Sequence, residues 1–476
     1  MTVDPRTPCI IGVARRTWRE EPAPEPLDLW ESVARDAAAD AGVPAAVESL
    51  DSIQVVFCQS WEYDDPCGRL ATRLGSEPAH RAYWGLGGSV PVRLLSSAAS
   101  AMAEGQLDLA LVVGGEALAT RRHLPDPAWS HAPASPSPYP ITIDRTEARH
   151  GIFQAYLTFA LLDSARRQHL GRTMADHQEA LGRLLAPLSE VAAKDPEHAW
   201  FPVAREASEI SEPTPTNRMV ATPYTKYMTA VMDVDMAAAV LVATEARADA
   251  LGVPTERRVY LRGSGAAEEP PTMAARPDLW RSPAMAASVA SALGPVAADE
   301  VAHLDLYSCF SASLQFARDA LGITDDRPLT VTGGLPYHGG PGSNYATHAL
   351  VAMAEALRAD PGARGLVTGV GMHMTSHAAT LWSTAPPASV PAPGTGPATA
   401  TATVPVAVGA EGPATVATFS TTFGREGPEW TALICDLPDG SRTYARLDRP
   451  AGVDDDLVDA AVTLEAGARG VVTAHR

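Results

Sequence analysis

The sequence predicts an α/β protein made of two successive layered halves, followed by a small β-rich domain. Apolar, strand-like runs alternate with alanine-rich, helix-like runs through the first part of the chain, and the same alternation starts again after Pro254. Strands separated by helices of this length are typical of βαβ units, in which helices cover the faces of a sheet. A chain of 476 residues is long enough for roughly two to four domains with large cores.

Each half contains a similar series of predicted elements. In the first half we expect strands or helices over residues 9–13, 29–41, 52–58, 94–103 and 109–113. In the second half we expect them over residues 259–263, 285–293, 301–307, 314–321, 346–358 and 365–370. From these two series we infer that the first half spans residues 1–253 and the second half residues 254–384.

Residues 123–223 interrupt this alternation and are predicted to form an insertion. Prolines cluster between Pro125 and Pro140, and a largely helical stretch runs from Gly151 to Leu185, just before Pro187. The insertion also contains several arginines, for which a solvated helix face is the favoured interpretation and a phosphate contact the alternative. They are Arg145, Arg149, Arg166, Arg167, Arg172 and Arg183.

The C-terminal part of the chain predicts a linker and a separate β-domain. Residues 385–413 are rich in Pro, Ala, Thr and Gly, which is typical of a linker. Strands are expected at 414–422, 429–437 and 443–447, the last two joined by a turn at Asp439-Gly440. Residues 414–476 therefore predict a small β-barrel.

Bulk composition excludes several classes of partner. A net charge of -19 argues against nucleic acid and anionic membranes as partners. No run approaches the roughly 18 apolar residues that a membrane span needs. The five cysteines show no metal-binding spacing and suit a reducing compartment, so a cytoplasmic location without a metal site is expected. They are Cys9, Cys58, Cys67, Cys309 and Cys435.

A glycine-rich segment from Gly333 to His348 resembles the catalytic loop of thiolases. In that family the loop contains a Gly-His-Pro motif, whose histidine helps to hold the thioester oxygen. Here the corresponding residues are Gly339-Gly340-Pro341, with glycine in place of the histidine. Glycine cannot polarise a carbonyl or move a proton with a side chain, so another group must do so if the chemistry is retained.

Further segments resemble thiolases in the same order along the chain. They are 8–17, 98–116 ending in Gly114-Gly115-Glu116, 233–245, Leu306-Tyr307-Ser308-Cys309-Phe310, and 366–374. Together they cover about 380 residues and most resemble the actinobacterial thiolase-like proteins that carry an extra C-terminal domain. The resemblance implies a duplicated layered thiolase fold, a mid-chain loop domain that covers the site and helps to hold coenzyme A (CoA), and an OB-like C-terminal domain. Members are often named acetyl-CoA acetyltransferases.

The nucleophilic cysteine of thiolases has no counterpart in this chain. Counting back from Glu116 places its position at Gly88, beside Ser89, and no cysteine lies between Cys67 and Cys309. A third family motif, Cys-x-Gly, is replaced by Gly369-Val370-Gly371. Ser89 is a candidate replacement nucleophile, although an N-cap or turn serine is the favoured interpretation. Ordinary thiolysis through an acyl-cysteine is not expected.

The candidate catalytic residues are therefore Tyr307, Cys309, His338, Tyr345 and Ser89. Tyr307 stands where the family has a histidine or asparagine, and with Tyr345 it suggests a tyrosine pair near the thioester. Cys309 matches a motif cysteine that can act as acid or base, or it is a buried core cysteine. His338 and His348 flank the loop.

The glycines Gly339, Gly340, Gly342 and Gly371 are the candidates for ligand contact, because glycine permits close approach and exposed N–H groups can form an oxyanion hole.

We expect an enzyme of lipid metabolism that acts on CoA thioesters, as an acyltransferase or in forming or cleaving C–C bonds, without an acyl-cysteine. The alternative is an inactive CoA- or acyl-CoA-binding protein or scaffold subunit. CoA is expected as substrate or ligand, with no permanently bound cofactor, and a homodimer or partner subunit is possible.

Overall fold

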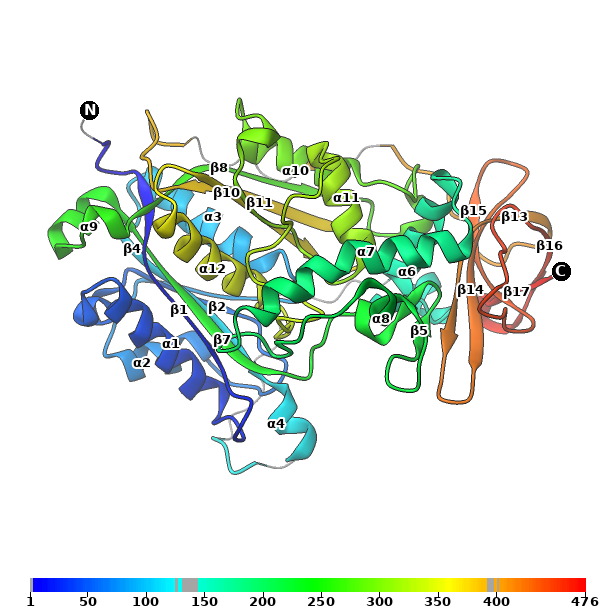
Figure 1. The fold of residues 1–476 in the computed structure, drawn as a ribbon, viewed down its shortest axis with the longest axis horizontal. Helices are drawn as coiled ribbons and strands as arrows, with labels where there is room; N and C mark the ends of the chain where they lie inside the picture. Colours follow the sequence, from blue (N-terminus) through cyan, green and yellow to red (C-terminus); the bar gives the residue numbers. More distant parts are fainter. Residues whose placement is uncertain (1–2, 125–126, 131–143, 392–397, 400–401) are drawn as a thin grey trace.

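The computed structural model describes residues 3–124, 127–130, 144–391, 398–399 and 402–476. It shows two α/β halves side by side, a helical insertion on one side of them, and a β-barrel beyond the insertion (Figure 1). The predicted duplicated α/β fold with a small C-terminal β-domain is confirmed.

The two halves share one twisted sheet with a repeated strand order. The strand order is β3-β2-β4-β7-β1 in the first half and β8-β11-β10-β9 in the second. In each half the first strand, β1 or β8, lies at the centre of the sheet and the last strand of that half, β7 or β11, lies next to it. The two meet where Cys9 pairs with Tyr260 and Ile10 with Val259. The strands are β1 (Pro8–Thr17), β2 (Ser52–Val56), β3 (His80–Trp84), β4 (Leu109–Ala117), β7 (Asp235–Thr244), β8 (Val259–Glu268), β9 (His303–Asp305), β10 (Arg364–Gly371), β11 (Ser376–Ser383) and the short β12 (Ala398–Thr399) beside β8.

Strands β4 and β7 are buried along their whole length, which explains why their sequences are continuous apolar runs rather than alternating ones. Helices α3 (Val90–Ala103) and α12 (Tyr345–Ala359) form the central layer and pack against strands of both halves. Both begin near the glycine loop, where the candidate site lies.

Other helices cover the outer faces. On the first half these are α1 (Pro26–Asp40) and α2 (Pro66–Leu74), and on the second α10 (Pro283–Leu293) and α11 (Ser311–Leu321). The connections contain α9 (Glu245–Leu251) and the 3-10 turns η1 (Pro44–Ser49), η3 (Thr255–Arg257), η4 (Met273–Ala275) and η5 (Ala298–Glu300). None of the helices in the described part of the chain has the length and apolar composition that a membrane crossing requires.

The insertion folds as a group of helices and a small hairpin; most of the predicted proline cluster lies outside the described residues. Its elements are α4 (Leu118–His123), α5 (Arg145–Arg149), α6 (Ala155–His169), α7 (Met174–Ala193), α8 (Ala207–Ser211), β5 (Met219–Ala221), β6 (Tyr224–Thr225) and η2 (Lys226–Met228). The helix expected to end before Pro187 instead continues through it, because Leu188 and Ala192 on the following turns are buried. Packing here outweighs the backbone hydrogen bond that proline removes.

Two insertion arginines are not on a solvated face. Arg166 and Arg167 are buried and pair with Asp319 of α11 and Asp456 of the C-terminal domain. Arg183 matches the solvated interpretation, since it is exposed and pairs with a neighbour on its own helix. The buried pair therefore anchors α6 between the second half and the barrel.

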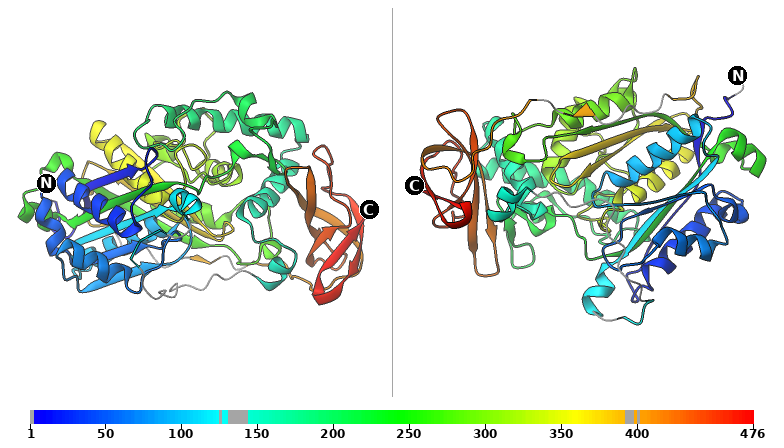
Figure 2. Two further views of the ribbon diagram at one scale, coloured as in Figure 1. Left: turned by 90° about the horizontal axis from the view of Figure 1, so that it is seen from below. Right: turned by 180° about the vertical axis from the view of Figure 1, so that it is seen from behind.

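The C-terminal domain is a closed barrel, seen at one end of the molecule in Figure 2. Strand β13 pairs with both β14 and β16, which closes the order β14-β15-β17-β16-β13. The hairpin β5–β6 of the insertion extends this sheet through Thr422 and Ala221. The elements are β13 (Gly412–Phe423), β14 (Pro428–Asp436), β15 (Arg442–Leu447), β16 (Ala461–Ala466), η6 (Ala468–Gly470) and β17 (Val472–His475). The predicted linker lies partly outside the described residues.

Candidate functional site

A cavity of about 270 Å³ lies where the glycine loop meets the start of α3 and the segment between β9 and α11. We call it the inner cavity. It brings together four of the predicted site residues: Tyr307, Cys309, Gly340 and Gly342. The remaining lining residues are Gly88, Gln154, Ala155, Tyr156, Phe159, Val220, Thr229, Ala230, Met232, Phe310, Leu335, Val370 and Met372. Its described lining therefore contains hydroxyl, amide and thiol groups but no Asp, Glu, His, Lys or Arg.

Tyr307 occupies the space beside Gly88. A Cβ atom at Gly88 would collide with the phenol oxygen and ring of Tyr307, so no side chain fits there while the tyrosine keeps its place. The tyrosine is fixed through its backbone: its N–H donates to Thr368 Oγ1 at 2.8 Å, and its carbonyl accepts from Ser313 Oγ at 2.7 Å. The space next to Gly88 is thus filled by a phenol.

The Tyr307 hydroxyl has no hydrogen-bond partner among the described residues, although its side chain is 5% exposed. Burial raises its pKa well above the ordinary value, and the neighbouring Cys309 adds to the rise. At neutral pH the group is therefore an uncharged phenol that can donate a hydrogen bond to a ligand in the cavity.

Cys309 also faces the inner cavity. Its carbonyl accepts a hydrogen bond from the N–H of Ala230 at 3.0 Å, which holds the segment before β7 across the cavity. The residue is 8% exposed, and burial raises the pKa of its thiol above the ordinary value. Because the thiolate is the reactive form, Cys309 is a weak nucleophile and a weak base in this setting.

The glycines of the loop serve packing as well as access. The N–H of Gly340 donates to the Val231 carbonyl at 2.8 Å, so it is not available to a ligand. Gly342 has φ 53°, and a Cβ there would collide with the Glu116 carboxyl group. Gly339, at φ 105°, lies away from the cavity against the insertion. A side chain at Gly342 would require the Glu116 carboxyl group to move, and one at Gly339 would press on Met236 of β7.

Gly371 ends β10 beside the inner cavity without lining it. A Cβ at Gly371 would lie 2.7 Å from the hydroxyl oxygen of Ser89. The next residue, Met372, does line the cavity and has φ 52°, an uncommon conformation for a side chain of this size. Backbone strain of this kind is concentrated at ligand sites.

Ser89 is the N-cap residue of α3, but its hydroxyl does not cap the helix. The hydroxyl is hydrogen-bonded to Ser376 Oγ at 2.9 Å, and the residue is buried outside the cavity lining. The structure therefore places Ser89 next to the site but directs its hydroxyl toward β11.

Tyr345 lies behind the loop in a buried polar network. Its hydroxyl donates to Asp305 Oδ1 at 2.9 Å and lies 2.6 Å from Thr332 Oγ1. The other carboxylate oxygen of Asp305 accepts from the side chains of Thr330 and Thr332 at 2.8 and 2.9 Å. The rings of Tyr307 and Tyr345 are in edge-to-face contact with centroids 5.6 Å apart, so the predicted tyrosine pair exists, but only Tyr307 lines the cavity.

His338 and His348 form a second buried pair behind the loop. Nε2 of His338 lies 3.4 Å from Nδ1 of His348, and the outer nitrogen of each ring has no partner in the described structure. Burial lowers the pKa of both imidazoles well below the ordinary value, so both are neutral at pH 7. Neither lines the inner cavity. Over the described ranges, no cluster of three or more His, Cys, Asp or Glu residues could hold a metal ion.

A wider opening of about 1200 Å³ adjoins the inner cavity, and we call it the basic mouth. The two share the lining residues Tyr156, Val220, Thr229 and Ala230, so they lie side by side. The mouth also contains the cations Arg122, Arg218, Lys226 and Arg425 and one carboxylate, Asp233, which pairs with Arg122. These cations were not predicted from the sequence, because they are scattered over four segments.

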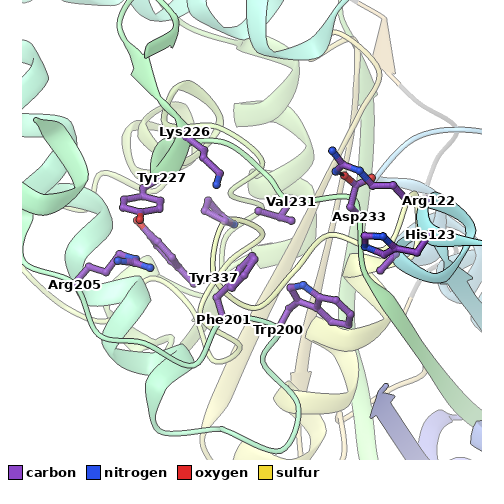
Figure 3. A pocket seen from close by; sticks show the side chains of 12 residues that line it. Arg122, His123, Trp200, Phe201, Arg205, Lys226, Tyr227, Val231, Asp233 and Tyr337 are labelled. Atoms are coloured by element: carbon purple, nitrogen blue, oxygen red, sulfur yellow. Dashed lines mark hydrogen bonds and ion pairs between the residues drawn. The ribbon is translucent and has the colours of Figure 1, made fainter. Parts of the chain in front are cut away.

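A third pocket, of about 590 Å³, adjoins the mouth, with which it shares Arg122, Lys226, Tyr227 and Asp233. Figure 3 shows the rings of Trp200, Phe201, Tyr227 and Tyr337 around it. The Arg205 guanidinium lies 4.0 Å from the centre of the Tyr227 ring. The Tyr337 hydroxyl is buried without a partner among the described residues. We call this the aromatic pocket.

One solved structure matches the chain almost end to end. It is described as a monomeric SCP2-thiolase like protein type 1 from Mycobacterium smegmatis, with 30% identity, a TM-score of 0.86, and coverage of 99% of this chain and 99% of that chain. No family model matches the sequence, and no curated protein matches it.

Two more distant structures share the fold of the core. One, described as an Ltp2-ChsH2(DUF35) aldolase, has a TM-score of 0.63 at 14% identity and covers 80% of this chain and 98% of that chain. The other, an acetyl-CoA acetyltransferase from Syntrophomonas wolfei, has a TM-score of 0.56 at 16% identity and covers 80% of this chain and 100% of that chain.

Proposed function

The chain belongs to the SCP2-thiolase-like proteins, and on that premise we propose that it binds CoA thioesters with the thioester group in the inner cavity. The observation that carries this proposal is the Tyr307 hydroxyl, which has no partner among the described residues and lies in a mostly apolar cavity beside the basic mouth. A hydroxyl that faces a cavity without a protein partner is available to donate a hydrogen bond to a ligand carbonyl.

The size and walls of the inner cavity suit a thioester with a short acyl group. Its volume of about 270 Å³ is just below the range of roughly 300–1,000 Å³ that is common for small-molecule pockets. Phe159, Phe310, Leu335 and Val370 supply apolar walls for the acyl carbons. Tyr307 would donate its hydrogen bond to the thioester oxygen and fix the orientation of the ligand.

The mouth supplies the charge complementarity that a nucleotide requires. CoA carries phosphate groups at the end opposite the thioester, and cationic side chains bind phosphates through charge-assisted hydrogen bonds. Lys226 and Arg218 line the mouth, which shares Tyr156 and Thr229 with the inner cavity. In a chain with net charge -19, such a local group of cations is needed to attract a polyanion.

The cavity does not favour acyl transfer through a covalent acyl-enzyme. Gly88 has no side chain, the Ser89 hydroxyl is turned toward Ser376, and the Cys309 thiol is protonated at neutral pH. A thioester bound beside Tyr307 is polarised but not attacked by a protein nucleophile. Binding without an acyl intermediate is therefore the function that the geometry supports best.

A second candidate function is the forming or cleaving of a C–C bond next to the thioester. It is favoured by the position of Tyr307, a neutral acid without a protein partner at the reacting end of the cavity. A phenol in this place could stabilise or protonate the enolate oxygen that such a reaction generates.

Calorimetric titration with CoA, acetyl-CoA and a longer acyl-CoA tests the proposal. We expect the wild-type protein to prefer acetyl-CoA over CoA, and Tyr307→Phe to reduce that preference about tenfold, since one hydrogen bond to the thioester oxygen is lost. Tyr345→Phe is the matched control, because it removes the neighbouring hydroxyl outside the cavity. The proposal would be contradicted if the wild-type protein bound none of the three ligands. It would also be contradicted if Tyr307→Phe and Tyr345→Phe reduced the preference for acetyl-CoA equally.

A further inference from the structure

We propose that the C-terminal barrel is part of the ligand site, and that its β13–β14 hairpin supplies Arg425 as a phosphate-binding residue at the basic mouth. The inference rests on the proposed binding of CoA thioesters and assigns a function to the added domain. Arg425 lines the mouth together with Arg218 and Lys226 of the insertion. The phosphate site is therefore composite, with cations from two parts of the chain.

The hairpin is held against the insertion by hydrogen bonds from backbone and side-chain donors. Thr222 N–H donates to the Thr421 carbonyl at 2.9 Å, and Ser420 Oγ donates to the Thr222 carbonyl at 2.8 Å. Arg218 Nη1 also donates to the carbonyl of Phe423, two residues before Arg425, at 3.3 Å. Because these contacts fix the end of β13 beside the mouth, the following turn projects Arg425 toward the same space as Arg218.

The charge of Arg425 is not neutralised within the described structure. It forms no ion pair with any described carboxylate, although Glu426 and Glu429 lie on the same hairpin. Arg442 of the same barrel shows the contrast, since it pairs with Asp436 at 2.7 Å. Lys226 is likewise without an ion pair in the described ranges. Arg425 and Lys226 thus lie at one opening of an acidic chain without a carboxylate partner, which favours an anionic ligand as their partner.

The excess of cations over carboxylates in the mouth favours a ligand with several negative charges. The mouth holds four cations against the single carboxylate of Asp233, which Arg122 already neutralises. The guanidinium of Arg425 presents paired donors that match a phosphate, whereas Lys226 offers a point charge. A ligand with several phosphates, such as the nucleotide end of a CoA thioester, can reach both residues across the opening of about 1200 Å³.

The test compares two ligands and two variants of the full chain. Arg425→Ala removes the proposed contact, and Arg449→Ala, at an exposed arginine of the same barrel outside the mouth lining, is the matched control. Calorimetry would use acetyl-CoA and acetyl-pantetheine, which keeps the thioester but lacks the nucleotide. We expect Arg425→Ala to weaken acetyl-CoA binding about tenfold, because a charge-assisted hydrogen bond is lost. Arg449→Ala should leave acetyl-CoA binding unchanged, and neither variant should alter acetyl-pantetheine binding.

Each other outcome overturns a defined part of the account. If Arg425→Ala binds acetyl-CoA as well as wild type does, the barrel has no part in phosphate binding, and the proposed function stands without it. If Arg425→Ala weakens both ligands equally, its effect is on the shape of the site and not on phosphate. If the wild-type protein binds neither ligand, the proposed function fails together with this inference. An exposed turn residue such as Arg425 can be replaced without disturbing the core.

Discussion

Each face of the glycine loop has a tyrosine beside it, and the two tyrosines differ in whether their hydroxyl groups have hydrogen-bond partners. On the cavity face, the Tyr307 hydroxyl has no partner among the described residues. On the buried face, the Tyr345 hydroxyl is bonded to Asp305 and Thr332. The rings touch, yet one hydroxyl is available to a ligand and the other stabilises the fold. The difference teaches that hydrogen-bond partners, and not residue type or sequence position, decide which tyrosine is a candidate for function.

The largest expected effect is the loss of the buried network by Asp305→Ala. This change removes the acceptor of Tyr345, Thr330 and Thr332 and leaves buried donors unsatisfied. We expect the free energy of unfolding to fall by about 3–5 kcal/mol, as for other broken buried networks. Urea denaturation followed by circular dichroism measures it. A loss below about 1 kcal/mol would show that the buried face does not stabilise the fold as described.

The next largest effect on stability is expected when a cysteine is introduced at position 88. Gly88→Cys places a Cβ atom into the phenol of Tyr307, so we expect a loss of about 2–3 kcal/mol in unfolding free energy from overpacking. The double variant Gly88→Cys/Tyr307→Ala should recover part of this loss, because the clash is removed. Thermal unfolding of the single and double variants measures the coupling between them. Equal stabilities of wild type and Gly88→Cys would contradict the placement of Tyr307.

A smaller effect is expected from pH through the buried histidines. Burial holds the pKa of His338 and His348 well below 6.5 in the folded protein, while the unfolded chain binds protons near that value. Below about pH 6.5 the unfolded state therefore holds more protons, and stability falls by up to about 1.4 kcal/mol per pH unit for each histidine.

The buried carboxyl of Asp305 acts in the opposite direction. Burial raises its pKa, so the folded state keeps its proton to higher pH than the unfolded state, and acidification through that range favours folding. Comparing wild type with His348→Gln at pH 7, 6 and 5 by denaturant unfolding isolates the histidine contribution, because Asp305 is common to both. The variant should lose less stability than the wild type between pH 6.5 and 5. Equal losses in the two proteins would contradict the claim that the buried histidines are neutral in the folded state.

Much of the fold followed from local patterns. The apolar runs of β4 and β7 and the alanine-rich α12 are regular elements whose periodicity is visible in the sequence. The barrel strands β13, β14 and β15 were also predicted near their observed bounds, because turn residues separate them, whereas β16 and β17 were not predicted. The hairpin β5–β6 was missed, since its strands are short and gain their order from pairing with β13.

The site was predictable only in part. Motif resemblance brought Tyr307 and Cys309 together correctly in one cavity, but it could not show that His338 and Tyr345 are sealed behind the loop. Side-chain direction along an irregular glycine loop has no periodic signature. The cations of the mouth come from distant segments, and only the tertiary fold brings Lys226 close to Arg425.

Chemical protection mapped by mass spectrometry tests most directly whether one ligand spans the inner cavity and the basic mouth. The chain has only two lysines, Lys226 in the mouth and the exposed Lys194 outside the lining of the three cavities, so the second is an internal control. Acetyl-CoA should slow modification of Lys226 by an amine reagent, and should protect it less in Tyr307→Phe, while Lys194 reacts at its unprotected rate. Equal modification of Lys226 with and without saturating acetyl-CoA, or equal protection in Tyr307→Phe, would contradict the account.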